Sequence, residues 1–198
     1  MRLLTATDVA IERGDRPLLR GVSLGVETGE LWQLIGPNGV GKSSLMRALA
    51  GLARLGVEGA IHRNGATLFI GHSSALKLAL TPLDNLRLHP ACDTLVDDDQ
   101  IILALSSVSL AGYESVPVGA LSAGQQRRVA LARLRLTRAQ LWFLDEPFTA
   151  LDTAGCEWLE QQITGHVASG GAVLFTSHQQ SRFGAQQHDL DLARYVSL

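Results

Sequence analysis

The sequence predicts an α/β fold of the phosphate-loop type, in which a mainly parallel β-sheet is flanked by helices. Apolar runs typical of buried strands occur at residues 31–35, 67–71, 141–145 and 172–176. Helical patterns follow the first and the third of these runs, and strands that alternate with helices indicate parallel pairing. A glycine-rich segment joins the first strand to its helix, as in loops that bind phosphate.

Length and composition set the broad class of the protein. With 198 residues, 46% of them hydrophobic, the chain can bury one full core, so a single domain over residues 1–198 is expected. No stretch approaches the roughly 20 consecutive apolar residues of a membrane-spanning helix, and Asp8 and Glu12 come too early for a signal peptide. The formal net charge of −2 gives no support to nucleic-acid binding, and Cys92 and Cys156 lack metal-ligand spacing. We therefore expect a cytoplasmic protein without direct nucleic-acid contacts.

The glycine-rich segment at residues 36–43, GPNGVGKS, matches the pattern GxxxxGK[ST] between a buried strand and the helix at residues 44–52. Its glycines let backbone N–H groups surround phosphate oxygens, and the helix start adds the positive end of its dipole. Lys42 is placed to reach the β- and γ-phosphates, and the Ser43 hydroxyl is a hard ligand for the accompanying Mg²⁺. The alternative interpretation is a glycine-rich turn with an exposed lysine. Such a turn would not need the complete pattern between a strand and a helix, so the phosphate loop is the better interpretation. The predicted nucleotide-binding residues are Gly36, Pro37, Asn38, Gly39, Val40, Gly41, Lys42, Ser43 and Ser44.

The segments around this core predict two smaller parts. Strand-like runs at residues 3–11 and 22–27, separated by a polar turn, predict an N-terminal antiparallel lobe, and an Asn-Gly turn follows at residues 64–65. Residues 81–120 are helix-like and form a small helical subdomain, with residues 1–80 and 121–198 as the nucleotide-binding core. The acids at residues 97–99 are predicted to cap a helix rather than to bind a cation, because acids are common in first turns.

Two acids follow the third apolar run. Asp145 is expected at the carboxyl end of a parallel strand, where ligands of open α/β sheets bind, and its carboxylate can hold Mg²⁺ or its water. Glu146 is predicted to orient and polarise the water that attacks the γ-phosphate. Without the phosphate loop, a turn opened by two acids before Pro147 would be an equally good interpretation.

Residues 121–125, LSAGQ, open a predicted helix that continues to about residue 138, with small residues that leave backbone N–H groups available to an anion. The segment resembles the signature LSGGQ of ABC-type ATPases. Further matches are the phosphate loop, the two acids, residues 149–152 (TALD) and His178 after the last apolar run. Together, the ordered motifs cover nearly the whole chain and identify it as a member of that family.

The resemblance implies that the nucleotide is ATP and that two copies form a head-to-tail dimer. Each ATP would lie between the phosphate loop of one subunit and the signature of the other. Ser122, Gly124 and Gln125 would then face the partner's γ-phosphate. Asp152 would cross the dimer interface, and His178 would hydrogen-bond the γ-phosphate and take part in catalysis with Lys42 and Glu146.

A second resemblance narrows the family. Gly71-His72 stands where ABC ATPases usually have a glutamine, and residues 80–86, 121–134 and 145–152 are similar to the ATP-binding subunits of the cytochrome c biogenesis haem exporter. This resemblance implies an ATP hydrolase bound peripherally, through an integral membrane subunit, to the cytoplasmic face of the inner membrane. Its role would be haem export or release of a haem-loaded chaperone, with contact to the membrane subunit through the surface around residues 72–84. Haem itself is not expected to bind, because no CxxCH motif is present and His72 serves the phosphate side.

Three parts of the sequence depart from these patterns. Residues 73–75 (Ser-Ser-Ala) differ from the haem-exporter family, and Ala123 replaces a signature glycine of ABC ATPases at large. The aromatic residue that usually stacks on adenine is absent near Arg13, so the planar guanidinium of Arg13 is expected to stack instead.

Other functions remain alternatives at this point. The chain could serve another ABC exporter. A soluble ABC ATPase acting on nucleic acid would normally carry a coiled-coil insertion, zinc cysteines or two cassettes, and a phosphate-loop kinase or GTPase would lack residues 121–125. The arginines late in the signature helix are predicted to lie on a solvated face rather than to bind RNA. They are Arg127, Arg128, Arg133, Arg135 and Arg138.

Overall fold

The computed structural model describes residues 1–14, 16–92, 95–177, 183 and 187–196. The chain packs as two compact units, and α5 (Thr153–Ala168) begins in the second and ends in the first. Unit 1 comprises Met1–Gly71, Gln140–Pro147 and Gly165–Leu198. Unit 2 comprises His72–Ala139 and Phe148–Thr164.

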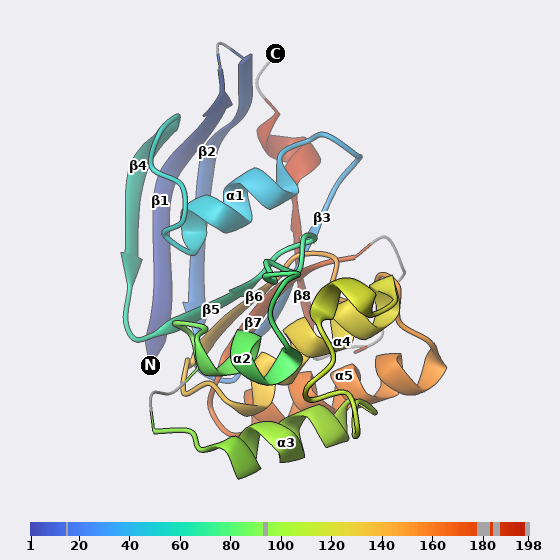
Figure 1. The fold of residues 1–198 in the computed structure, drawn as a ribbon. Coiled ribbons are helices and arrows are strands. Elements are labelled where there is room, and N and C mark those ends of the chain that lie inside the picture. The colour runs from blue at the N-terminus through green and yellow to red at the C-terminus, as the bar shows by residue number, and fades with distance from the viewer. Residues whose placement is uncertain (15, 93–94, 178–182, 184–186, 197–198) are drawn as a thin grey trace. The chain divides into compact units, whose positions relative to one another are not determined.

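Unit 1 contains a parallel sheet with the strand order β5-β6-β7-β3-β8 (Figure 1). The strands β6 and β7 are buried along their whole length, as expected for strands covered on both faces. The predicted α/β fold and its four apolar strands are therefore confirmed. The strand bounds are β3 (Leu31–Ile35), β5 (Thr67–Ile70), β6 (Leu141–Leu144), β7 (Ala172–Thr176) and β8 (Gln187–Asp191).

The strand β8 was not predicted from the sequence. It pairs in parallel with β3 at the edge of the sheet, and only Leu190 of its five residues is buried. An edge strand needs to bury few side chains, so its polar composition gives no apolar run to detect.

The antiparallel sheet of unit 1 has the strand order β2-β1-β4 and consists of β1 (Arg2–Arg13), β2 (Arg16–Glu27) and β4 (Val57–Arg63). The predicted lobe is confirmed, but both N-terminal strands are longer than expected. The polar residues expected in the turn belong to the strands, since Glu12 pairs with Pro17 and Arg13 with Arg16, and the register between β1 and β2 shifts at a bulge between Ala6 and Val9, where Asp8 has a φ of 51°. The Asn-Gly turn connects β4 with β5, which belong to different sheets.

The core of unit 1 lies around α1 (Lys42–Leu49), which follows the β3 loop and lies beside the antiparallel sheet (Figure 1). Its side chains Leu45, Met46 and Leu49 are completely buried and pack with residues of both sheets. The short helix η4 (Leu192–Tyr195) follows β8 and contributes Leu192 to the same core. The helix α1 that follows the phosphate loop is thereby fixed by apolar packing.

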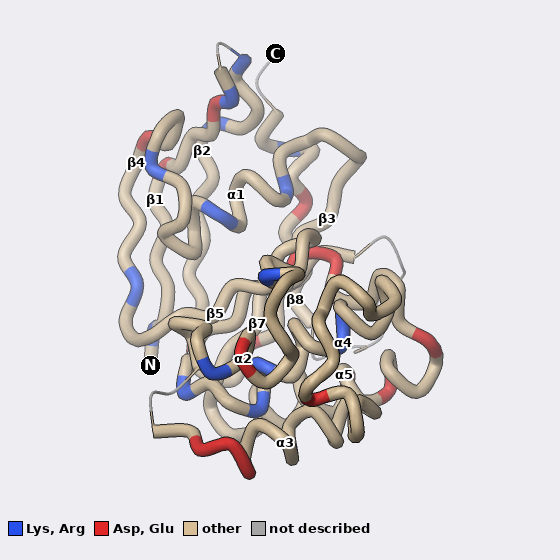
Figure 2. The backbone as a smooth tube through the Cα atoms, in the orientation of Figure 1, with Lys and Arg blue, Asp and Glu red and all other residues tan. Residues whose placement is uncertain are grey.

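Unit 2 is a helical cluster around a second apolar core that includes Leu86, Leu105 and Val129. The predicted cap of α3 is confirmed: Asp97 Oδ1 accepts a bond from the Gln100 N–H at 2.9 Å, and Figure 2 shows acids at this helix start. The α-helix expected to continue to about residue 138 ends earlier, because α4 gives way at Arg133 to a 3₁₀ turn, η2. The bounds are α2 (Pro82–Arg87), α3 (Asp98–Ser107), η1 (Val118–Ala120), α4 (Ala123–Ala132) and η2 (Arg133–Arg135). Among the described residues, no helix is long and apolar enough to cross a membrane.

Candidate functional site

The phosphate loop connects β3 to α1 in unit 1 and depends on backbone conformations that suit glycine. Gly36, Gly39 and Gly41 have φ values of 144°, 79° and 114°. A Cβ on Gly36 would lie 3.1 Å from Val40 Cγ1, and one on Gly41 would lie 3.2 Å from Leu19 Cδ1. The loop therefore tolerates no larger residue at these positions without strain.

Lys42 lies along the inside of this loop. Its ammonium donates hydrogen bonds to the Gly36 carbonyl at 2.7 Å and to the Pro37 carbonyl at 3.2 Å. The helix α1 begins after Gly41, and no side chain of the described residues caps it. The first N–H groups of the helix, including those of Ser43 and Ser44, thus face the loop without an intrahelical acceptor, which suits an anion.

The two acids lie where β6 ends. Asp145 is 1% exposed, and its N–H donates to the Ile70 carbonyl at 2.8 Å, which extends the pairing with β5 by one residue. Glu146 is half-buried and has a φ of 50°, a conformation that non-glycine residues seldom adopt. The chain therefore turns sharply between the two carboxylates.

A single hydroxyl on the neighbouring strand holds both acids. Thr176, completely buried at the end of β7, donates to Asp145 Oδ1 at 2.9 Å and accepts from the Glu146 N–H at 2.8 Å. Sequence reasoning missed Thr176. The available signal was a hydroxyl residue at the carboxyl end of an apolar strand, the edge where Asp145 was also expected.

The residues of unit 1 can serve a nucleotide-bound Mg²⁺. Ser43 offers a hydroxyl and Asp145 a carboxylate, both hard oxygen donors of the kind that Mg²⁺ prefers. No group of three or more His, Cys, Asp or Glu side chains arranged for a metal occurs in the described part of the chain. Such a pair fits an ion that also takes oxygens from phosphate and water.

Two other residues of unit 1 were predicted to belong to the site, Arg13 and His178. Arg13 is exposed at the end of β1, paired in register with Arg16 near the tip of the hairpin with β2. His178 lies outside the described residues.

In unit 2, the signature residues form the start of α4. The Ser122 hydroxyl accepts the Gln125 N–H at 3.2 Å, while Gln125 Oε1 accepts the Ser122 N–H at 2.9 Å. This capping box fixes both side chains at the helix start. Gly124 lies beside residues 149–152, since a Cβ there would be 3.0 Å from the Ala150 carbonyl oxygen. We call α4 together with η2, residues 123–135, the signature helix.

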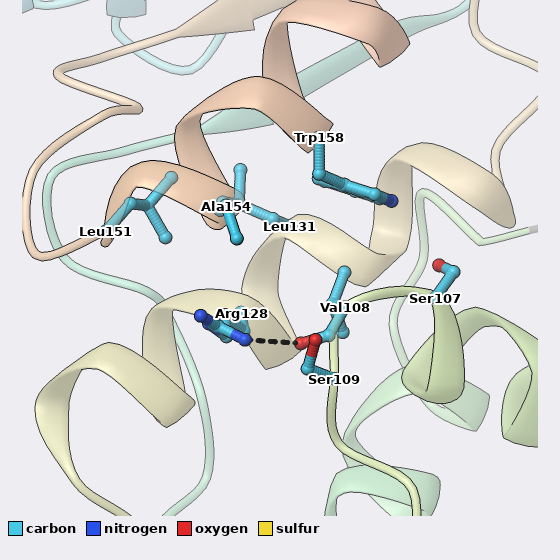
Figure 3. Close-up of a pocket in the computed structure, with 9 residues that line it drawn as sticks. Ser107, Val108, Ser109, Arg128, Leu131, Leu151, Ala154 and Trp158 are labelled. Atoms are coloured by element: carbon cyan, nitrogen blue, oxygen red, sulfur yellow. Dashed lines mark hydrogen bonds between the residues drawn. The ribbon is translucent and has the colours of Figure 1, made fainter.

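Asp152 bonds within its own chain. Its Oδ1 accepts the Gly155 N–H at 2.8 Å near the start of α5, and Arg128 Nη2 donates to both carboxylate oxygens at 2.7 Å. The Gly155 N–H and the positive charge of Arg128 lower the pKa of Asp152. Arg128 Nη1 also donates to the Val108 carbonyl at 3.1 Å, beside a cavity of about 30 Å³ (Figure 3). Arg128 therefore joins the end of α3, the signature helix and the start of α5.

His72 is exposed and lines an open cavity of about 500 Å³ in unit 2. It begins an irregular segment, residues 72–80, which we call the His72 loop. Buried Asn85 fixes this loop by accepting the Lys77 N–H at 2.7 Å and donating to the Lys77 carbonyl at 3.0 Å. The Gly119 N–H donates to the Leu78 carbonyl at 2.8 Å, yet the Leu78 side chain is 56% exposed. The loop is thus irregular but held at several points.

The structure brings the predicted residues together in two sets. Unit 1 holds residues 36–44 with Asp145 and Glu146, and unit 2 holds His72, the signature residues and Asp152. The prediction that the arginines of the signature helix lie on a solvated face is wrong for Arg127 and Arg133, which are 4% and 1% exposed. Sequence reasoning also missed the contacts of Arg128 and Arg133, because their helical pattern gave no reason to separate them from surface arginines.

Comparisons with known proteins agree with the motifs. The family described as "ABC transporter" matches residues 19–149. The chain is 45% identical over 207 residues to a "Cytochrome c biogenesis ATP-binding export protein CcmA" of Pseudomonas savastanoi pv. phaseolicola, covering 98% of this chain and 97% of that protein. It is 47% identical over 191 residues to the protein so named in Salmonella typhi, covering 89% and 90%.

Solved structures share the fold. One is a "Putative ABC transporter (ATP-binding protein)" from Pyrococcus furiosus, with a TM-score of 0.80 and 25% sequence identity. The similarity covers 98% of this chain and 99% of that one.

Proposed function

From the premise that the chain belongs to the ABC transporter family, and within it to the cytochrome c biogenesis ATP-binding export proteins, we propose that it hydrolyses ATP to drive haem export or release of a haem-loaded chaperone. The observation that carries this proposal is 45% identity over 98% of the chain to such a protein. ATPase motifs, in order along the chain, support the same conclusion.

In the proposed reaction, unit 1 binds ATP. Residues 36–44 surround the phosphates with backbone N–H groups, and Lys42 leaves its loop carbonyls to meet the β- and γ-phosphates. Mg²⁺, held through Ser43 and Asp145, would neutralise charge that develops on the phosphate oxygens. Glu146 accepts a hydrogen bond from the attacking water and orients it in line with the γ-phosphate. His178 hydrogen-bonds the γ-phosphate, and Arg13 stacks on the adenine.

The proposed assembly is a head-to-tail dimer with ATP between the subunits. Ser122, Gly124 and Gln125 face the γ-phosphate bound by the partner, and the Ser122 hydroxyl, which accepts the Gln125 N–H, keeps its own hydrogen for donation. Asp152 is exposed and so accessible at the interface. His72 takes the place of the usual glutamine on the phosphate side.

The dimer proposal has a direct test. Glu146→Gln should bind ATP and Mg²⁺ but hydrolyse ATP about 10²–10⁴-fold more slowly, because the water loses its carboxylate. Undepleted ATP should shift this variant from monomer to dimer in light scattering. Adding Ser122→Arg should abolish the shift, since a bulky cation would occupy the interface. A dimer that persists in the double variant would contradict the head-to-tail arrangement. Normal ATP turnover by Glu146→Gln would contradict the catalytic role of Glu146.

We also propose that the His72 loop contacts an integral membrane subunit, which would place the protein peripherally at the cytoplasmic face of the inner membrane. The exposed Leu78 is an apolar anchor on a loop with fixed backbone, a combination that suits a partner surface. Leu78→Glu should reduce membrane association and spare ATP binding. Leu103→Glu is the matched control, because Leu103 is 69% exposed on α3 of the same unit. Equal loss in both variants would contradict a specific surface.

The substrate proposal is tested in cells that depend on the protein. A strain carrying only Glu146→Gln should stop maturing c-type cytochromes while b-type cytochromes still form. Normal c-type cytochromes in a strain without the protein, with another substrate retained inside, would favour the alternative of a different ABC exporter. We propose that the purified chain itself does not bind haem, and a haem titration with saturable absorbance changes would contradict this.

We also propose that the chain is divided into a nucleotide-binding core and a small helical subdomain at about residues 81–120.

A further inference from the structure

Arg133, in the η2 turn that ends the signature helix, is 1% exposed and is the largest fully buried side chain of the described residues. Its Nη1 donates to the Ser74 carbonyl at 3.0 Å and its Nη2 donates to the Ala75 carbonyl at 3.2 Å. In the described part of the chain, no carboxylate lies within ion-pair distance of it. Neutral carbonyl dipoles of the His72 loop therefore hold a buried positive charge.

Stability does not explain this arrangement. Burial lowers the pKa of Arg133 to about 10, so the guanidinium stays charged at neutral pH. Two titratable neighbours are uncharged at neutral pH. Burial raises the pKa of Cys92 to about 11, so its thiol supplies no negative charge, and burial, assisted by Arg133, lowers the pKa of His89 to about 4, so its imidazole is neutral. An apolar side chain of similar length would fill the same space without the desolvation cost of a charge. The presence of a charged guanidinium at this buried position is therefore better explained by the two carbonyl groups to which it donates hydrogen bonds.

The guanidinium holds the first part of the His72 loop. Ala75 has a φ of 48°, an unfavourable conformation for alanine, and its carbonyl is one of the two acceptors. The far end of the loop is fixed separately by Asn85 and by the N–H groups of Val118 and Gly119. Arg133 thus links the residues just after His72 to the signature helix across 59 and 58 positions of sequence.

We infer that Arg133 is a positioning residue of the ATPase cycle, which fastens the His72 loop to the signature helix so that the two move as one body. The inference rests on the proposed function, because Ser122 at the helix start and Leu78 in the loop receive their roles there. Under this arrangement, a displacement of the signature by the partner's nucleotide reaches the membrane-facing loop directly. Both ends of the link lie within unit 2.

The test compares Arg133→Met, Arg133→Lys and the control Arg135→Met in the full chain assembled with its membrane subunit. Arg135 is exposed on the same turn. In Arg133→Met, kcat for ATP should fall about 10-fold or more while KM stays within about twofold, because ATP binding belongs to unit 1. Amide hydrogen exchange over residues 72–80 should rise about 10-fold, and the thermal midpoint should not fall. Arg133→Lys should recover part of kcat, since an ammonium can reach the carbonyls without the planar fork.

Three results would overturn the inference. These are wild-type kcat and unchanged loop exchange in Arg133→Met, a faster exchange spread over the whole apolar core of unit 2, and loss of folding in both Arg133 variants. The last two would make Arg133 a purely structural residue. Glu146→Gln, assayed in parallel, distinguishes a failure of the proposed ATPase function from a failure of the proposed role of Arg133. If it stays active, the proposed function fails, whereas an inactive Glu146→Gln beside a normal Arg133→Met refutes the link alone.

Discussion

The hydroxyl of Thr176 is the smallest group that contacts both the proposed Mg²⁺ ligand Asp145 and the proposed catalytic residue Glu146, so its removal gives a sharp test of the site. Thr176→Val keeps the shape of the side chain and replaces only the hydroxyl, by a methyl group. It removes the bond to Asp145 Oδ1 at 2.9 Å and leaves the Glu146 N–H without its acceptor at 2.8 Å. A hydrogen bond to a charged group contributes about 1.5–3 kcal/mol and a neutral one about 0.5–1.5 kcal/mol, so the summed loss is about 2–4 kcal/mol. Thr176→Ser is the matched control, because it keeps the hydroxyl and loses one buried methyl group, at about 1 kcal/mol.

The measurements are hydrogen exchange at the Glu146 amide and single-turnover ATP hydrolysis. In Thr176→Val, the difference of about 1–3 kcal/mol from the serine variant should lower protection of this amide about 10–100-fold. The chemical step should slow by a similar factor, because Glu146 leaves its strained conformation and no longer aligns the water. Thr176→Ser should stay close to the wild type in both assays. If valine and serine variants hydrolyse ATP at the same rate, the hydroxyl does not position the acids and the reasoning is wrong.

Two further predictions concern single contacts. Lys42→Ala should weaken ATP binding about 10–100-fold in calorimetry, because a charge-assisted contact to the phosphates is lost. The control is Lys77→Ala, which removes an exposed lysine of unit 2 and should bind ATP normally. Equal ATP affinities of the two variants would count against the phosphate-loop assignment. The pKa of Asp152 lies below its ordinary value of 3.8, so its contribution to stability is complete above the unfolded pKa and is lost as pH falls through the folded pKa. Asp152→Asn should flatten this acid part of the stability curve in urea unfolding from pH 6 to 3, and a curve parallel to that of the wild type would refute the lowered pKa that the Gly155 N–H and Arg128 give to Asp152.

The sequence predicted those parts of the molecule whose signal is local. Burial on both faces makes β6 and β7 almost continuously apolar, and the phosphate loop needs glycine at fixed spacing, so both were found. The edge strand β8 buries a single side chain and was missed. The bonds of Thr176 and Arg133 join positions 31 and 59 residues apart, and a lone threonine or arginine carries no trace of such partners. Contacts of this kind depend on how strands and helices pack, which periodicity does not encode.

The contacts of the signature helix indicate how the proposed head-to-tail dimer, in which each chain would supply half of every ATP site, would transmit a signal. At its start, Ser122 and Gln125 fix each other; in its middle, Arg128 holds Asp152; at its end, Arg133 holds the His72 loop. Each of these contacts lies inside unit 2, whereas the phosphate loop, Asp145 and Thr176 lie inside unit 1. Nucleotide affinity and mechanical coupling should therefore be separable by mutation. Changes in unit 1 would alter ATP binding or the chemical step, while changes at Arg133 would leave ATP bound with normal affinity but uncouple the signature helix from the His72 loop.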